Sequence, residues 1–341
     1  MTAGSVPISS GQLPELGPDP RLTVVIPARD AAATLPATVS AVLAQDPPPD
    51  EVVVAVGPSG DGTAEVAEGL ARMHRCVEVV ANPSGRTSDG LNATIAASTG
   101  QVIARVDAHA LLPPGYLGTA VAALRATGAG NVGGRQVPDA DAGFARAVAA
   151  AMRSPLGAGG AAYRSGTQAG PADTVYLGVF RREALEAVGG FDPAFVRNQD
   201  AELNLRLRAA GYLVWLEPGL AVTYRPRGSL RALASQYLQY GRWRRLTARR
   251  HPGSLGPRQL VPPATVTALG LAALVSLLRR RPGPWAVVAG GYTAVVLAGG
   301  MRAAPEPRSG PATALALATM HLSWGIGFLI GPPRHLPPPT G

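Results

Sequence analysis

Short apolar runs alternate with helix-patterned segments through the first part of the chain. The runs are rich in valine, isoleucine and leucine and end at polar, glycine or proline positions, which is typical of buried strands. The predicted strands cover 22–26, 51–56, 77–80 and 102–106, and the predicted helices between them cover 34–43, 63–74 and 88–98. Strands that alternate with helices form a parallel sheet with helices on both faces. We therefore expect an α/β domain with a mostly parallel sheet, whose strand-ending loops meet at one edge.

The pattern weakens over 138–175, which is rich in alanine and glycine, and we expect a mobile loop over 154–173. We expect regular structure again at 174–180, followed by helices over 182–188 and 198–210. Apolar residues then recur at helical spacing over 230–246, with arginines between them. This combination predicts a basic amphipathic helix that lies on a membrane surface.

Three apolar stretches without a charged side chain make up most of the C-terminal part of the chain. They cover 261–278, 285–301 and 312–330. The third is long enough to span a bilayer, and the first two are at the short limit. Arginines between 244 and 250 place the preceding domain on the cytoplasmic side, whereas those at 279–281 fit better if the first stretch lies in the interface. We expect a multi-pass protein of the plasma membrane in which two or three helices cross.

The composition narrows the possible partners. The chain has 341 residues and a net charge of +9, and all 31 of its basic side chains are arginine, partly through a compositional bias. A positive balance suits nucleic acid, anionic lipid or a phosphorylated substrate. The chain has no nucleic-acid-binding motif, so a nucleic-acid partner is not expected. The single cysteine, Cys76, rules out an internal disulfide, and residues 1–20 resemble a disordered leader and not a signal peptide.

A carboxylate and an imidazole follow the fourth predicted strand. Asp107 and His109 are separated by one residue and lie directly after the buried run 102–106. The carboxyl end of a strand in an open α/β sheet is where ligands bind, and an oxygen and a nitrogen ligand at this spacing can share one divalent cation. The alternative is a strand that ends in an ordinary polar turn.

Other polar loops are expected at the same edge of the sheet. The glycine and serine loop 57–63 precedes a helix and suits a ribose or a phosphate, although an ordinary turn has the same composition. A metal at Asp107 would neutralise a diphosphate leaving group. Asp200, at the start of a predicted helix, could accept the proton of an attacking hydroxyl, or it could simply complement the helix dipole. A metal-binding carboxylate and a base are the minimum parts for an in-line displacement on a nucleotide sugar.

Motifs in this order resemble those of family 2 glycosyltransferases, the inverting enzymes of the GT-A fold, over roughly residues 21–245. The segment VVIPARD resembles the family's opening strand, and SGDGT resembles the latter half of its DDGSxDGT loop. RVDAH stands where the family has DxD, NQDAE where it has the base motif, and QYGRW resembles QxxRW. The segments RVDAHA, QDAELNLRLRAAG, QYLQYGRWR and HLSWGIGFLIG are more narrowly similar to succinoglycan-type exopolysaccharide glycosyltransferases.

The resemblance implies a Rossmann-like GT-A fold, a UDP-sugar donor, Mg²⁺ or Mn²⁺, and Asp200 as the general base. The metal would be bound by Asp107, with His109 as a ligand or close to it. The donor would contact Pro27, Arg29, Asp30, Ser59, Asp61, Arg86 and Asp107. The acceptor, a lipid-linked or growing polysaccharide, and its diphosphate would contact Glu202, Gln239, Arg242 and Trp243. Further partners would be the membrane and a polysaccharide assembly complex.

Two departures from the family pattern leave alternatives open. Val56 and Gly57 stand where the family has acidic residues that read the nucleobase, and His109 replaces the second acid of DxD. The first leaves the uracil preference open, and with the second His109 could contact phosphate in place of the metal. The missing acids at 56 and 57 also support one alternative function, an inactive nucleotide-sugar-binding subunit of an export complex. A separate alternative is an enzyme that transfers the sugar to a polyprenyl phosphate. The expected organisation is a leader at 1–20, a GT-A domain at 21–228, an interfacial helix at 229–252, membrane helices at 261–331 and a tail at 332–341.

Overall fold

The computed structural model describes residues 13–332, so most of the predicted leader and nearly all of the predicted tail lie outside the described residues. The described chain divides into two compact units. Unit 1 comprises 13–136 and 166–222, and unit 2 comprises 137–165 and 223–332. The predicted domain at 21–228 is therefore divided, because 137–165 group with the C-terminal helices. Residues of the leader that are described contact unit 1: Arg181 donates to Pro14 O at 2.9 Å and Arg125 donates to Gly17 O at 3.0 Å.

Unit 1 is built on a mixed sheet that is parallel where the sequence predicted strands. Across the described residues the strand order is β3-β2-β1-β4-β7-β5-β8-β6. The strands are β1 (Leu22–Ala28), β2 (Glu51–Val56), β3 (Val77–Ala81), β4 (Val102–Arg105), β5 (Asn131–Pro138), β6 (Gly170–Pro171), β7 (Tyr176–Arg181) and β8 (Val214–Tyr224). β3, β2, β1 and β4 are parallel neighbours, whereas β7 is antiparallel to both β4 and β5. The mostly parallel α/β fold is confirmed, and the antiparallel part was not predicted.

The order of the parallel strands determines where a ligand site forms. The chain passes from β1 outward to β2 and β3 and then returns to place β4 on the other side of β1. The direction in which strands are added therefore reverses between β1 and β4, and the crevice at such a switch point is the usual ligand site of an α/β sheet. The helices of this part are α1 (Leu35–Leu43), α2 (Thr63–Met73), α3 (Thr87–Ala97), α4 (Tyr116–Thr127), α8 (Arg182–Ala187) and α9 (Gln199–Ala209).

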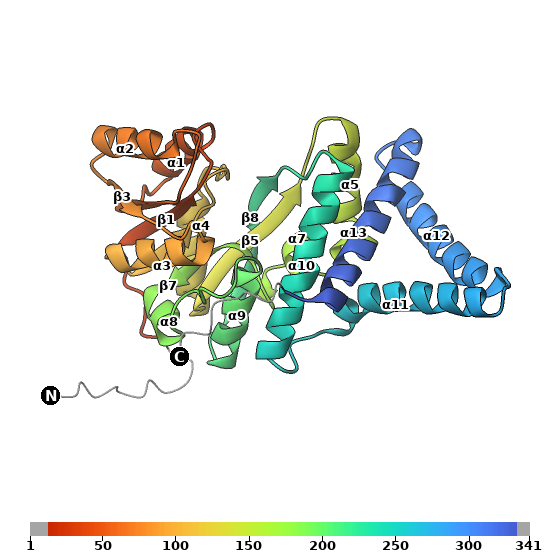
Figure 1. Ribbon diagram of the computed structural model, residues 1–341. Helices are drawn as coiled ribbons and strands as arrows, with labels where there is room; N and C mark the ends of the chain where they lie inside the picture. The colour runs from red at the N-terminus through yellow and green to blue at the C-terminus, as the bar shows by residue number, and fades with distance from the viewer. Residues whose placement is uncertain (1–12, 333–341) are drawn as a thin grey trace. The chain divides into compact units, whose positions relative to one another are not determined.

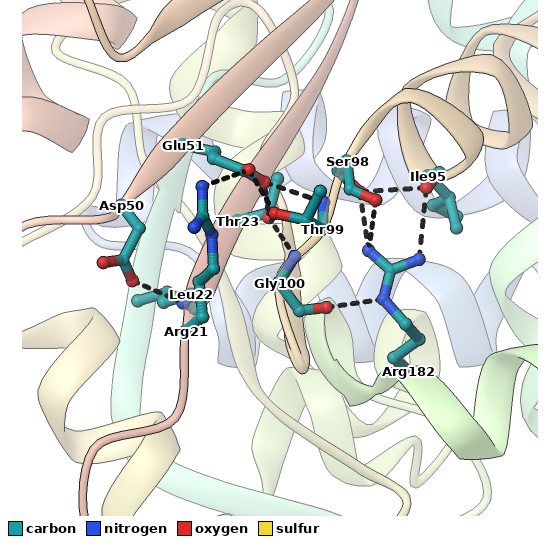
Figure 2. Close-up of polar contacts among 10 residues, drawn as sticks. All are labelled: Arg21, Leu22, Thr23, Asp50, Glu51, Ile95, Ser98, Thr99, Gly100 and Arg182. Atoms are coloured by element: carbon teal, nitrogen blue, oxygen red, sulfur yellow. Dashed lines mark hydrogen bonds and ion pairs between the residues drawn. The ribbon is translucent and has the colours of Figure 1, made fainter.

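A polar network ties the opposite, amino-terminal ends of β1, β2 and β4 together (Figure 2). The Glu51 carboxylate accepts hydrogen bonds from the Thr23 hydroxyl at 2.6 Å, from Thr99 N at 2.9 Å and from Arg21 at 2.6 Å. Arg182 closes the end of α3 by donating to Gly100 O at 2.5 Å and to Ser98 O at 3.0 Å. Burial raises the pKa of Glu51, but the hydrogen bonds outweigh it and lower the pKa to about 2.

Glu51→Gln is expected to destabilise unit 1 and to flatten its acid response. A charged acceptor of several hydrogen bonds contributes about 1–3 kcal/mol. Because the pKa falls from 4.5 to about 2 on folding, this stability is present above pH 4.5 and is lost as the pH falls towards 2. Denaturant unfolding of wild type and variant along this pH range measures it. The exposed Glu68→Gln is the control, and equal acid sensitivity of wild type and Glu51→Gln would contradict the assignment.

Unit 2 consists mainly of helices. They are α5 (Gly143–Arg153), α6 (Pro155–Ala158), α7 (Ala162–Ser165), α10 (Leu230–Arg250), α11 (Pro257–Leu278), α12 (Gly283–Ala303) and α13 (Gly310–Ile330), with a 3₁₀ turn at Pro307–Ser309. α6 and α7 lie inside the segment expected to be a mobile loop. Three segments, Pro257–Leu278, Gly283–Ala303 and Pro307–Ile330, are long and apolar enough to cross a membrane.

The apolar face of α10 is covered by protein. Leu233 and Tyr237 are buried in one cluster with Val148 of α5 and with Leu317 and Met320 of α13, and α10 lies beside α13 (Figure 1). The amphipathic pattern predicts a helix on a membrane surface, whereas these apolar residues pack against other helices of unit 2. His321 of α13, a polar residue in the third apolar stretch, contacts Leu156 O at 3.0 Å and the Tyr292 hydroxyl of α12 at 3.5 Å.

A glycine allows α10 and α13 to approach closely. A Cβ at Gly241 would stand 2.0 Å from Trp324 O, and one at Gly327 would stand 2.1 Å from Leu238 O. Gly241→Ala is therefore expected to cost about 1–3 kcal/mol through overpacking. Gly270→Ala, where a Cβ meets nothing within 4 Å, should instead gain helix propensity. Thermal unfolding of the two variants in detergent tests this, and equal melting temperatures would contradict the close packing.

Candidate active site

One buried arginine joins the two carboxylates singled out in the sequence. Arg105, at the end of β4, has a side chain that is only 6% exposed. Its Nη2 lies 2.8 Å from Asp107 Oδ1 and its Nε lies 3.2 Å from the same oxygen. Its Nη1 forms an ion pair with Asp200 Oδ1. Asp107 and Asp200 are far apart in the chain, yet they share one guanidinium, so they belong to one site.

The position of Asp200 is fixed by contacts of the segment before α9 with α3. Asn92 of α3 donates to Phe191 O at 2.7 Å and accepts from Phe191 N at 2.9 Å, and Ser88 contacts Phe195 O at 3.4 Å. Asn198 then adopts a positive φ of 67°, and α9 begins at the next residue. Asparagine tolerates this left-handed conformation better than most residues. The turn places Asp200 in the first turn of α9, where the helix dipole also stabilises its negative charge.

The two carboxylates differ in exposure and environment. The side chain of Asp107 is 20% exposed and that of Asp200 is 39% exposed. Burial raises the pKa of Asp107, but the positive charge of Arg105, followed by those of His109 and Arg197, outweighs it and leaves the pKa below its usual value. Asp107 is therefore an anion at neutral pH and can bind a cation.

The donor set around Asp107 fits a metal that is shared with a substrate. His109 is exposed, two residues beyond Asp107, in a turn closed by Ala110 N and Asp107 O at 2.8 Å. Over residues 13–332 no group of three or more histidine, cysteine, aspartate or glutamate side chains could hold a metal ion. Mg²⁺ is commonly held by one or two protein ligands together with substrate phosphates. Asp107 and His109 fit that arrangement and not a closed structural metal site.

The loops after β1 and β2 brace each other beside this strand end. Asp30 N donates to the Ser59 hydroxyl at 3.0 Å, and Ala32 N donates to Asp61 Oδ2 at 3.0 Å. The hydrogen bond from the Thr63 hydroxyl is the main cause that lowers the pKa of Asp61. The two loops are therefore held together by hydrogen bonds. They lie next to the end of β4, because β1 is bonded to that end: Val106 N donates to Val25 O at 3.0 Å.

The remaining predicted donor residues lie on these loops and on the start of α3. Pro27 is half-buried at the end of β1, and the exposed Arg29 lies 3.5 Å from Asp30. Arg86 is 33% exposed and forms an ion pair with Asp89 at 2.8 Å. Arg29 and Arg86 are thus accessible to a phosphate. To bind one, each would exchange its contact with a neighbouring aspartate for a contact with the phosphate.

Comparisons with known proteins show the family of the chain. Residues 20–244 match the model of the family described as glycosyltransferase like family 2. The chain is 37% identical over 282 residues to the succinoglycan biosynthesis protein ExoA of Rhizobium meliloti, covering 81% of this chain and 84% of that protein. The chain belongs to glycosyltransferase family 2.

Its fold is also that of a solved glycosyltransferase. A mannosyltransferase from Pyrobaculum calidifontis, in complex with GDP-Man and Mn²⁺, superposes with a TM-score of 0.58 over 95% of this chain and 90% of that one, at 22% identity. This likeness confirms the GT-A fold expected from the sequence.

Glu202 departs from the role that the family resemblance implied. Its side chain is 1% exposed and its two oxygens lie 2.7 and 2.8 Å from Nε and Nη2 of Arg206. Arg206 in turn donates to Val188 O and Gly190 O. Glu202 therefore holds α9 on the segment before it. This burial and pairing favour a structural role over the acceptor contact expected from the sequence.

The residues of the QxxRW-like motif lie on α10 in unit 2. Gln239 and Arg242 are half-buried, and the Nε of Arg242 is buried without a hydrogen-bond partner in the described residues. Trp243 is 4% exposed, so its ring is buried. An acceptor-stacking role for Trp243 does not fit this burial, whereas Gln239 and Arg242 stay candidates.

The motifs in the sequence do not identify two further residues of the candidate site. Arg105 pairs with both carboxylates, and the charge of Arg197 acts on Asp107. The signal for Arg105 was available, because an arginine in an otherwise apolar buried strand needs a partner. Arg197 had no comparable signal, since it stands in a loop of a chain rich in arginine.

Proposed function

We propose that the chain is a membrane-bound, inverting, metal-dependent glycosyltransferase that moves a sugar from a UDP-sugar to a lipid-linked or growing polysaccharide acceptor. The observation that supports this most is the shared contact of Asp107 and Asp200 with Arg105. This shared contact supports the proposal that Asp107 binds the metal and that Asp200 is the base of the same site. The family supports the transfer reaction, and the name of the Rhizobium meliloti relative supports a role in exopolysaccharide synthesis.

The proposed step is a single displacement. An acceptor hydroxyl oxygen attacks the anomeric carbon as the bond to the donor's phosphate oxygen breaks, which inverts the configuration. The hydroxyl proton passes to Asp200, and the electron pair of the broken bond goes to the nucleoside diphosphate. A bound Mg²⁺ or Mn²⁺, held by Asp107 and His109, would neutralise charge that develops on the diphosphate.

Arg105 has a positioning role in this proposal. Its guanidinium pairs with both carboxylates and holds them close together, and its positive charge helps to keep the pKa of Asp107 below the usual value. Because Asp200 is 39% exposed, it remains accessible to a hydroxyl while paired. Arg105 itself is buried and needs no contact with substrate.

The nucleotide and the orientation in the membrane belong to the same proposal. Val56 and Gly57 lack the acids expected to read a base, and Asp30 or backbone amides would substitute. Because the solved mannosyltransferase binds GDP-Man, GDP-sugars should be tested as donors beside UDP-sugars. Arginines that precede α11 favour a cytoplasmic catalytic domain in the plasma membrane. A polysaccharide assembly complex remains a proposed partner.

The joint placement of both carboxylates favours an enzyme over an inactive binding subunit. The test is release of nucleoside diphosphate by the full chain in detergent, with a panel of UDP- and GDP-sugars, Mn²⁺ and a short lipid-linked saccharide. We expect turnover with a UDP-sugar that stops when EDTA removes the metal. Turnover that is indifferent to EDTA would contradict the metal assignment, and donor binding without turnover on any acceptor would favour the subunit.

A further inference from the structure

Unit 2 contains an arginine whose neighbours are tyrosines. Arg164, on the short helix α7, donates from Nε to the Tyr163 hydroxyl at 3.1 Å. Its Nη1 lies 3.4 Å from both Gly157 O and the Tyr237 hydroxyl, and its guanidinium carbon lies 5.4 Å from the centre of the Tyr163 ring. Within residues 13–332 no ion pair includes Arg164. Its positive charge is therefore contacted only by neutral groups of the described residues, which are two tyrosine hydroxyls and a backbone carbonyl.

This environment leaves hydrogen-bonding capacity for an anion. A guanidinium has five N–H donors in a planar fork, and among the described residues the contacts of Arg164 involve only Nε and Nη1. The Nη1 contacts, at 3.4 Å, are long for hydrogen bonds. A half-buried cation without a carboxylate is costly unless something pairs with it. An oxyanion with several oxygens matches both the charge and the fork.

The tyrosines around Arg164 are themselves ordered. Tyr237 is 5% exposed and its ring meets that of Tyr240 edge to face at 5.5 Å. Gln236 donates to the Tyr240 hydroxyl at 3.0 Å and to the Tyr224 hydroxyl at 2.8 Å. Burial raises the pKa of Tyr237 despite the charge of Arg164, so its hydroxyl stays protonated and can donate to an anion.

The segment that carries Arg164 is attached to the candidate membrane helices. Arg258, at the start of α11, donates to Gly159 O at 3.4 Å. His321 of α13 contacts Leu156 O at 3.0 Å, and a Cβ at Gly299 of α12 would stand 2.3 Å from Leu156 Cδ1. All three segments able to cross a membrane thus contact α6 or the turn after it. An anion that reaches Arg164 beside these helices is best supplied by a lipid.

We propose that Arg164, with the hydroxyls of Tyr163 and Tyr237, binds the phosphate or diphosphate group of a membrane lipid. The inference deepens the proposed function, because a lipid-linked acceptor carries such a group and the site would hold that acceptor by its anionic end. Terminal phosphate oxygens fit the free edge of the guanidinium, whereas the phosphodiester of an ordinary phospholipid offers fewer oxygens to the fork.

The test is equilibrium binding of radiolabelled farnesyl diphosphate to the full chain in phosphatidylcholine nanodiscs. Arg164→Gln is expected to weaken binding by about tenfold or more, the loss of a charge-assisted pair of hydrogen bonds. Arg164→Lys should weaken it less, because it keeps the charge and loses the fork. Tyr237→Phe should weaken it while the ring packing stays. Arg249→Gln, an exposed arginine on α10, is the matched control and should bind like wild type.

Several results would overturn the inference. Equal binding by wild type, Arg164→Lys and Tyr237→Phe would show that Arg164 only braces α7 against α10. Equal weakening by Arg249→Gln would show a general charge effect. Competition by inorganic pyrophosphate as strong as that by unlabelled farnesyl diphosphate would assign the site to a free phosphate and not to a lipid.

The same nanodiscs separate this inference from the proposed function. Release of nucleoside diphosphate is measured beside lipid binding. Arg164-dependent lipid binding without sugar transfer would reject the proposed function and keep the lipid site. If sugar is transferred to a lipid-linked acceptor but lipid binding does not depend on Arg164, the proposed function is kept and the lipid site at Arg164 is rejected.

Discussion

Asp200→Asn is expected to lower the turnover number of sugar transfer by about 10²–10⁴-fold, the usual contribution of a general base. The amide keeps the size of the side chain but cannot accept the hydroxyl proton. Donor binding should change little, because the proposed metal and diphosphate contacts come from Asp107 and its neighbours. The turnover number, KM for the donor and Mn²⁺-dependent nucleotide binding should be measured on the same preparation.

The control for this prediction is Asp173→Asn. Asp173 is an exposed aspartate in unit 1, 3.5 Å from Arg208, and its variant should keep wild-type turnover. If Asp200→Asn transfers sugar as fast as wild type, Asp200 is not the base and its position reflects only the helix dipole. If it loses donor binding to the same extent as turnover, Asp200 belongs to the donor site.

Arg105→Met is expected to damage both stability and transfer. The substitution leaves Asp107 and Asp200 as neighbouring carboxylates without their shared cation. Breaking a buried pair costs about 3–5 kcal/mol, and the lower end of that range applies because Asp200 is partly exposed. Without the guanidinium charge the pKa of Asp107 should rise, so the rising limb of the pH–rate profile should move to higher pH.

Arg105→Lys separates the charge from the geometry. Lysine keeps the cation but cannot reach both carboxylates with a planar fork, so it should recover most of the stability and only part of the turnover. Unfolding midpoints and pH–rate profiles of both variants measure these effects. A fully active and stable Arg105→Met would show that the two carboxylates need no common partner.

The parallel half of the fold was predictable because each element there carries a strong local signal. Strands β1, β2 and β4 are continuous apolar runs, buried on both faces between helices. Strand β5 was missed because its sequence, NVGGRQVP, contains two glycines. They are required by close packing: a Cβ at Gly134 would lie 1.4 Å from Leu220 O. Local propensity cannot report such a contact with a distant strand.

The sequence indicates the acidic residues of the candidate site, but it does not indicate which arginines pair with them. Asp107 follows a predicted strand, and Asp200 lies at the start of a predicted helix. Both carboxylates form ion pairs with the same arginine, Arg105. Glu202 has the same charge and stands in the same turn, yet it faces Arg206 inside the fold. Which side of a short helix faces the protein depends on packing, because the polar residues around α9 leave no clear apolar stripe.

The amphipathic pattern of α10 shows a related limit. Apolar residues at helical spacing indicate that one face is buried, but they do not identify what buries it. Here the partners are α5 and α13, which lie within the same compact unit. A membrane surface would have produced the same pattern.

We propose that Asp107 anchors a donor-bound metal beside Asp200. Anomalous diffraction from crystals of the chain grown with a UDP-sugar and Mn²⁺ would locate that metal. We expect one manganese peak bonded to an Asp107 oxygen and to the diphosphate, with Asp200 facing the anomeric carbon and not bonded to the metal. A manganese bound elsewhere, or a donor whose anomeric carbon lies away from Asp200, would rule out the proposed site.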